Sequence, residues 1–254
     1  MKKKKKKKSA MDVITTIILV IAVCVFLFSL IKLVTLLIPY YVGGKDYDEV
    51  KKLAIIETQT EEEDGPSFQV DFDKLLEENP DTVAWVRFDE PSIISYPVVK
   101  SKDNNEYLTK TFTANDNKLG AIFMDMHNAP DFTDTNTIIY GHNMRVGDQM
   151  FSQMRKYSDS DFCSQYPYFY IYTPDNKEMK YRVFSAGVVK ETAENYRTSF
   201  ASDEAVDEFI NVCRNSSNYP VDVEVNKDSK IVTLSTCTCV NEDERFIVHG
   251  VLEE

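Results

Sequence analysis

The longest run of hydrophobic positions lies near the N-terminus. Residues 13–38 are apolar apart from four hydroxyl side chains and the single charge of Lys32. A helix of about 20 apolar residues spans the hydrocarbon core of a bilayer. The pattern therefore predicts one transmembrane helix over residues 13–38. Lys32 lies near its outer end, where the long side chain reaches the interface.

Further along, short apolar runs alternate with clusters of Asn, Asp, Gly, Pro and Ser. Eight of them have the length and spacing of strands: 82–88, 93–99, 121–124, 137–140, 168–172, 179–189, 230–237 and 245–252. Two segments carry helix signals, namely 71–78 and 202–214, the second capped by Ser202 or Asp203. We therefore expect a mainly β fold: an eight-stranded, closed or nearly closed barrel with an N-terminal helix and a helix inserted between late strands.

Charge divides the chain. Residues 1–45 hold nine of the 29 basic residues and one acid, whereas residues 46–254 hold 20 basic and 40 acidic residues. Because lysines beside a membrane span stay in the cytoplasm, the chain is predicted to cross the cell membrane once, with its C-terminal part outside. The expected parts are a cytoplasmic Lys-rich tail (1–12), a transmembrane signal anchor (13–38), a solvated extracellular linker (39–66) and one folded domain (67–254).

Three other readings of the composition are weaker. A cleaved signal peptide needs a shorter apolar core and a small-residue cleavage site, which Leu-Leu-Ile-Pro-Tyr at 36–40 does not provide. The acidic exterior argues against nucleic acid as a partner. Three scattered histidines and the lack of a Cys-x-x-Cys pair give no metal site, and nothing in the sequence calls for a cofactor.

Cys237 is the candidate nucleophile. It ends the strand predicted at 230–237, and Arg245 begins the next one. If the two strands are antiparallel neighbours, Arg245 lies beside Cys237, where a guanidinium stabilises a thiolate and hydrogen-bonds an acyl oxyanion. An ion pair between Arg245 and one of the acids at 242–244 is the alternative.

Of the three histidines, His142 is the candidate acid or base. It follows a predicted strand end and the turn residue Gly141, although a loop histidine that caps backbone groups is the alternative. His249 alternates with apolar residues within a strand and is predicted to be structural. His127 lies in a polar loop with no partner visible in the sequence.

Taken together, these segments resemble the sortase family. Thr233–Cys237 fits its T-L-x-T-C signature, Tyr140–His142 fits its histidine segment, and Arg245 fits the arginine of the following strand. The likeness to class B runs from about residue 68 to 252. It includes the stretches 79–86, 96–99, 103–108 and 120–125 and the helix near 202–216.

The resemblance implies a sortase-type barrel and a membrane-anchored cysteine transpeptidase of a Gram-positive cell surface. It assigns Cys237 as the nucleophile, His142 as the proton donor to the leaving amine, and Arg245 as the group that orients substrate and stabilises the oxyanion. It also implies substrate-binding roles for Ser235, Thr236 and Tyr140, although β-strand propensity alone would explain Thr236.

The implied substrate is a secreted surface protein with a sorting motif near its C-terminus. In class B the motif is typically like Asn-Pro-Gln-Thr-Asn and is cut after Thr. The implied acceptor is an amine of a peptidoglycan precursor such as lipid II, with a pilin lysine or water as alternatives.

The other cysteines leave two questions open. Cys239 lies two residues after Cys237, and in an extended strand the two would point the same way, so a disulfide brake and an inert thiol are both conceivable. A bridge between Cys163 and Cys213 is also open. The rival functions are an extracellular thiol redox protein that uses Cys237 and Cys239, and a non-enzymatic surface binding module.

Overall fold

The computed structural model describes residues 9–58, 67–144 and 146–253. The chain divides into two compact units, one ending at Val42 and the other beginning at Gly43. The lysine run at 2–8 and the acidic stretch at 59–66 of the expected linker lie outside the described residues.

Helix α1, Ala10–Ala54, contains the predicted span. It begins after a reciprocal cap: the Ser9 hydroxyl accepts the Met11 N–H at 3.3 Å, and the Asp12 carboxylate accepts the Ser9 N–H at 3.0 Å. Its most apolar 18-residue window has a mean hydropathy of 3.1, so by length and composition the helix suffices to cross a membrane.

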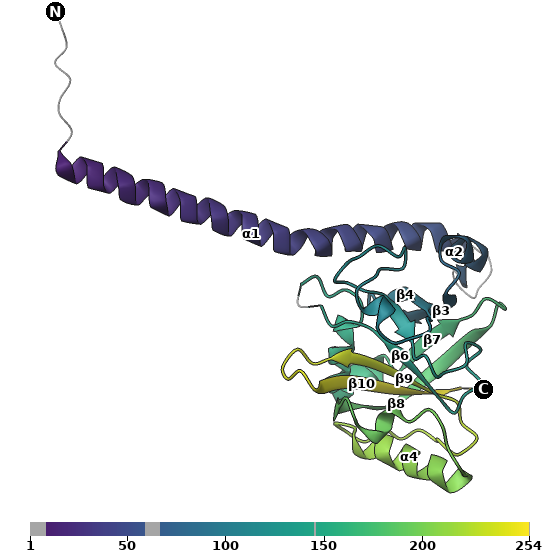
Figure 1. The fold of residues 1–254 in the computed structure, drawn as a ribbon. Helices are drawn as coiled ribbons and strands as arrows, with labels where there is room; N and C mark the ends of the chain where they lie inside the picture. Colours follow the sequence, from purple (N-terminus) through teal and green to yellow (C-terminus); the bar gives the residue numbers. More distant parts are fainter. Residues whose placement is uncertain (1–8, 59–66, 145, 254) are drawn as a thin grey trace, which may run out of the picture. The chain divides into compact units, whose positions relative to one another are not determined.

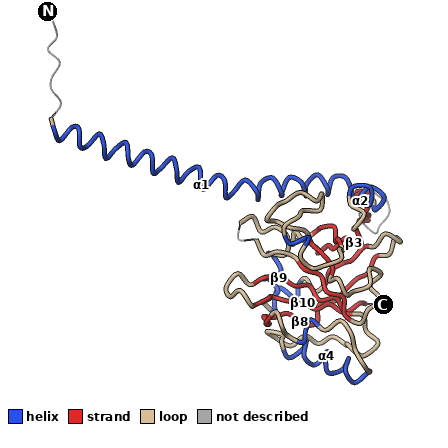
Figure 2. The backbone as a smooth tube through the Cα atoms, viewed as in Figure 1, coloured by secondary structure: helices blue, strands red, loops and turns tan. Residues whose placement is uncertain are grey.

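Eight strands of the second unit form a closed barrel in the order β10-β8-β7-β3-β4-β5-β6-β9, closed by the β9–β10 pair. Figure 1 shows this barrel, and Figure 2 separates its strands from the loops that join them. The strands are β3 Thr82–Phe88, β4 Ser95–Val99, β5 Ile122–Met124, β6 Asn136–Tyr140, β7 Tyr168–Tyr172, β8 Glu178–Lys190, β9 Ile231–Cys237 and β10 Glu244–Leu252. The β4–β5 and β6–β9 pairs are parallel, and the other six are antiparallel. The predicted fold class is confirmed.

The inserted helix is α4, Asp203–Asn215, and Ser202 caps it by accepting the Ala205 N–H at 3.3 Å. Its buried face repeats every three or four residues and packs on β8, β9 and β10. The resulting cluster contains Phe184, Val206, Phe209, Ile210, Cys213, Ile231 and Val251. This helix therefore covers the part of the barrel that contains the last two strands.

The smaller elements are β1 Ile55–Thr58, β2 Ser67–Val70, α2 Phe72–Glu78, η1 Glu106–Leu108, η2 Ser152–Ser158, α3 Ser160–Gln165 and η3 Glu194–Tyr196. The helix predicted at 71–78 is α2, and the Asp71 carboxylate caps it by accepting the Lys74 N–H at 3.2 Å. The antiparallel β1–β2 pair was not predicted from the sequence.

Residues 43–54 differ from the expected solvated linker. They continue α1 and bury Tyr47, Val50 and Ala54, which are 3%, 3% and 0% exposed. The Tyr47 hydroxyl donates to the Gly120 carbonyl at 2.7 Å and accepts the Phe112 N–H at 3.2 Å. These three apolar positions recur every three or four residues and so share one helix face. The charged residues between them give the segment the average composition of a solvated linker.

Candidate active site

A cleft of about 430 Å³ opens at one rim of the barrel. Because β6 and β9 are parallel, their carboxyl ends lie side by side there, and β10 begins at the same rim. All six residues predicted for the site line the cleft: Tyr140, His142, Ser235, Thr236, Cys237 and Arg245. Asn104, Asn105, Leu108, Phe123, Gly141, Glu191 and Tyr196 complete the lining.

Cys237 is the last residue of β9 and is partly exposed to solvent. Its backbone is held from the β6 side, because the Asn143 side-chain amide donates to the Cys237 carbonyl at 2.8 Å. Directly opposite in the antiparallel β9–β10 ladder lies Arg245. The expected side-by-side placement of thiol and guanidinium residues is therefore present in the register.

His142 follows β6 through Gly141, whose N–H donates to the Ser235 carbonyl at 3.0 Å. A Cβ at Gly141 would lie 2.4 Å from the Ile122 side chain, so a side chain does not fit at this position. The His142 Nε2 lies 2.7 Å from the Leu108 carbonyl oxygen. Since a carbonyl only accepts, Nε2 carries the proton, and Nδ1 is the ring nitrogen that is free to exchange one.

Arg245 is fixed by three hydrogen bonds. Its Nη1 donates to the carbonyls of Glu242 and Glu244 at 2.7 and 3.0 Å, and its Nη2 donates to the Glu191 carboxylate at 2.6 Å. The acid that pairs with the guanidinium is thus Glu191, just after β8, rather than an acid at 242–244. These bonds engage three of the five guanidinium donors.

Ser235 and Thr236 precede the candidate nucleophile on β9 and are 2% and 3% exposed. The Ser235 hydroxyl lies 2.8 Å from the Tyr196 hydroxyl, and burial raises the pKa of Tyr196 to about 12. The Thr236 hydroxyl is buried and has no hydrogen-bond partner within the described part of the chain.

The other titratable candidates lie outside the cleft. His249 is fully buried in β10, and burial lowers its pKa to about 3; this agrees with the predicted structural role. His127, which had no visible partner in the sequence, lies 2.9 Å through Nδ1 from the Asp125 carboxylate. Over residues 9–58, 67–144 and 146–253, no three His, Cys, Asp or Glu side chains gather as metal ligands.

All five cysteines are free thiols, so Cys163 and Cys213 are not bridged. Cys237 and Cys239 are not bridged either, and they do not share an extended segment. β9 ends at Cys237, and Cys239 has a φ of 61°, the left-handed region, where the chain turns toward β10. The Cys239 thiol lies 3.4 Å from the Asn143 carbonyl, to which it donates.

Leu108, Glu191 and Tyr196 were not predicted as site residues from the sequence. Glu191 follows β8 and Tyr196 lies in η3, both remote from the motif segments, whereas Leu108 ends the stretch 103–108 that resembled class B but had no assigned role. No local pattern marks them, because only closure of the barrel brings these loops to the rim. Asn104 was within a stretch that resembled class B, but it had no assigned role.

Known proteins with similar sequences share this architecture. The sortase domain model matches residues 90–253. Sortase B of Listeria monocytogenes is 34% identical over 178 residues, which cover 68% of this chain and 70% of that protein. Sortase B of Staphylococcus aureus is 36% identical over 170 residues, or 65% and 67% of the two chains. The crystal structure of sortase B from B. anthracis in complex with AAEK1 has a TM-score of 0.73 and 29% identity, covering 85% of this chain and 99% of that one.

Proposed function

The chain belongs to the sortase family as a sortase B-like cysteine transpeptidase, and on this premise we propose that Cys237 is its nucleophile, His142 its proton carrier and Arg245 its oxyanion partner. The observation that carries the proposal is the β9–β10 register, which sets Arg245 opposite Cys237. This pair borders the cleft that His142 also lines.

The chemistry then follows the positions of these groups. The Cys237 thiol first gives its proton to His142. The resulting thiolate attacks the carbonyl carbon of the scissile peptide bond, and the carbonyl oxygen takes up negative charge that the Arg245 guanidinium stabilises. Collapse of this intermediate breaks the C–N bond, while His142 gives a proton to the leaving amine. An acceptor amine attacks the thioester, its proton returns to His142, and the thiolate is restored.

We assign the binding of substrate to the rest of the cleft. Tyr140, Ser235 and Thr236 would contact an extended peptide with a motif like Asn-Pro-Gln-Thr-Asn, cut after Thr. The acceptor would be an amine of a peptidoglycan precursor of the lipid II type. The support is the resemblance to class B together with the place of all three residues in the lining of the cleft.

The N-terminal part would hold the enzyme at the cell membrane. We propose that residues 13–38 span the bilayer once, that 1–12 stay in the cytoplasm and that 67–254 work outside. The long apolar stretch of α1 and the adjacent lysines support this topology. On intact protoplasts, antibody should reach a C-terminal tag, and an N-terminal tag only after permeabilisation. The opposite labelling would reverse the assignment.

Peptide cleavage by the full chain in detergent micelles tests the catalytic roles. Cys237→Ala should abolish turnover of a fluorogenic sorting-motif peptide, and His142→Ala or Arg245→Ala should lower kcat by about 100-fold or more. Cys239→Ser is the matched thiol control and should stay active. Turnover by Cys237→Ala would refute the nucleophile. Loss of function in Cys239→Ser with His142 dispensable would favour a thiol redox protein.

A further inference from the structure

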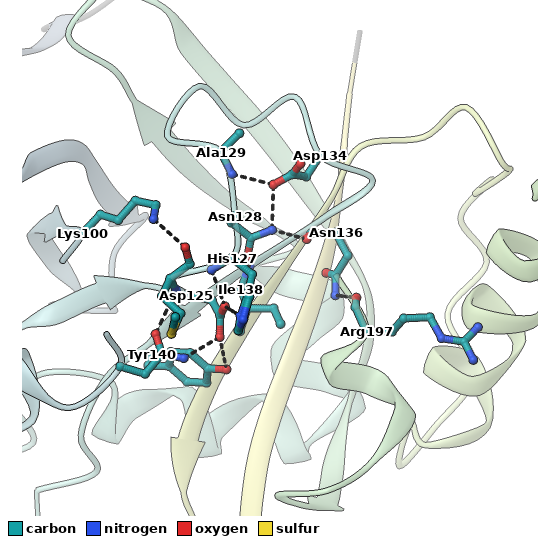
Figure 3. A network of polar contacts seen from close by, with 12 residues as sticks. Lys100, Asp125, His127, Asn128, Ala129, Asp134, Asn136, Ile138, Tyr140 and Arg197 are labelled. Atoms are coloured by element: carbon teal, nitrogen blue, oxygen red, sulfur yellow. Dashed lines mark hydrogen bonds and ion pairs between the residues drawn. The ribbon is translucent and has the colours of Figure 1, made fainter. Parts of the chain in front are cut away.

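Asp125 follows β5 directly and is 5% exposed, yet it does not line the cleft. Its backbone N–H donates to the Ile138 carbonyl of β6 at 2.9 Å, so its position is tied to the barrel wall. Figure 3 shows its carboxylate at the meeting point of His127 and Tyr140. A buried carboxylate of this kind needs partners, and the structure supplies four.

All four partners are donors. One carboxylate oxygen accepts the His127 backbone N–H and its ring Nδ1–H, both at 2.9 Å. The other oxygen accepts the Asn104 side-chain amide at 2.8 Å and the Tyr140 hydroxyl at 2.9 Å. Burial raises the pKa of Asp125, but the hydrogen bonds from His127, Tyr140 and Asn104 outweigh it and the pKa is lowered. The group is therefore an ionised carboxylate with its four acceptor sites filled.

Two of these donors belong to residues that line the cleft, Asn104 and Tyr140. The Asn104 amide is fixed at both ends, because its oxygen accepts the Met126 N–H at 2.8 Å while its nitrogen donates to Asp125. Its orientation is thereby set, and its second amide hydrogen remains available for a ligand.

Asn104 and the rings of Tyr140, Phe123 and Tyr196 form one side of the cleft, which we call the peptide-binding wall. The Tyr140 ring centroid lies 5.2 Å from that of Phe123 and 6.3 Å from that of Tyr196. The Tyr196 hydroxyl in turn reaches Ser235 on β9. A shift of the Tyr140 hydroxyl would therefore move an aromatic wall that extends to the strand of the nucleophile.

We propose that Asp125 is a positioning residue that sets the peptide-binding wall of the cleft by holding Asn104 and Tyr140 in one arrangement. The inference rests on the proposed function, because the ligand of the wall is the sorting peptide. Asp125 itself lies outside the cleft and does not touch the reacting atoms, so it would affect peptide binding only through Asn104 and Tyr140.

The Asp125→Asn substitution probes this role because it keeps the shape and replaces an acceptor by a donor. The new amide faces four donors, so at least one pair is mismatched in either orientation. His127 has two bonds to the first oxygen, one of them from the backbone. The mismatch therefore falls on Asn104 or Tyr140, and the wall loses its fixed geometry.

A matched control lies further along the same loop, which joins β5 to β6. The Asp134 carboxylate accepts the Asn128 amide at 2.8 Å and the Ala129 N–H at 2.7 Å, and it lines no part of the cleft. Figure 3 shows this carboxylate bonded to Asn128 and Ala129, away from Tyr140. Asp134→Asn makes the same chemical change in the same loop, at a carboxylate that binds neither Asn104 nor Tyr140.

The test is the steady-state cleavage of a fluorogenic sorting-motif peptide by the full chain in detergent micelles. Asp125→Asn should raise KM about tenfold while kcat stays within about threefold of the parent chain, whereas Asp134→Asn should leave both constants unchanged. A double variant of Asp125→Asn and Tyr140→Phe should be much less impaired than the product of the two single effects. An unchanged KM in Asp125→Asn, or an equal rise in Asp134→Asn, would overturn the proposal.

A second variant covers the case in which the first does not fold. If Asp125→Asn does not fold, Tyr140→Phe removes one donor from the same carboxylate while retaining the ring. It should raise KM about threefold, and an unchanged KM would then count against the wall. Failure of the proposed function looks different, because the parent chain itself would not cleave the peptide, or Cys237→Ala would.

Discussion

His249 offers a quantitative test of how the core of the barrel responds to pH. Its Nδ1 lies 3.2 Å from the Ser185 hydroxyl, which itself donates to the Cys213 carbonyl at 2.5 Å. The Ser185 oxygen therefore accepts, Nδ1 carries the proton, and Nε2 is buried without a partner in the described structure. Protonation of Nε2 would bury a charge next to the Phe184 ring, whose centroid lies 5.7 Å away.

The magnitude follows from linkage. Burial lowers the pKa of His249 in the folded chain from its ordinary value of 6.5 to about 3. Below about pH 6.5 the unfolded chain binds a proton at this position that the folded chain does not, so stability is complete above that pH and falls as the pH is lowered toward 3. At about 1.4 kcal/mol per pKa unit, the loss between pH 8 and pH 5 is about 2 kcal/mol.

The assay is urea unfolding of the full chain in detergent micelles at the two pH values, followed by the fluorescence of Trp85. This is the only tryptophan of the chain and it is 0% exposed. His249→Asn should lose about 2 kcal/mol less than the parent chain between pH 8 and pH 5, because all other groups titrate alike. Ser185→Ala keeps the imidazole and should keep its pH dependence. Equal losses in His249→Asn and the parent chain would refute the reasoning.

Two further predictions concern the packing around the site. Tyr47→Phe removes the hydroxyl that donates to the Gly120 carbonyl and accepts the Phe112 N–H, so the free energy of unfolding in urea should fall by about 2–4 kcal/mol. An unchanged urea midpoint would contradict a stabilising role of these two hydrogen bonds. Gly187→Ala places a Cβ 2.0 Å from the Ser216 carbonyl oxygen, so the free energy of unfolding should fall by about 3 kcal/mol or more; a loss below about 1 kcal/mol would contradict this close approach.

The barrel was predictable because its strands carry local signals. Each predicted run agrees with the observed strand to within two residues at either end. The β1–β2 pair escaped because its strands have four residues each, too few to establish a period. The packed end of α1 escaped because Tyr47, Val50 and Ala54 are sparse among charged residues, and only the tertiary contacts reveal the face they share.

The sequence predicted the part of the candidate site whose residues lie on two strands that follow each other in the chain and pair in the sheet. Cys237 and Arg245 are eight residues apart, and a tight connection between antiparallel strands brings them together. Glu191 and Leu108 were missed, since their loops reach the rim only through the closed sheet. The turn at Cys239 was not predictable, because no local pattern marks the left-handed φ of 61° that this residue adopts just after β9 ends.

The central claim is that Cys237 forms a thioester with a sorting peptide. The most direct measurement is intact-mass and peptide-mapping mass spectrometry of the full chain, trapped with a library of sorting-motif peptides in the absence of an acceptor amine. The account predicts an acyl adduct whose mass equals the peptide part up to Thr, located on the fragment that contains Cys237 and absent from Cys237→Ala. An adduct on another residue, or cleavage of the peptides with no adduct on Cys237, would contradict it.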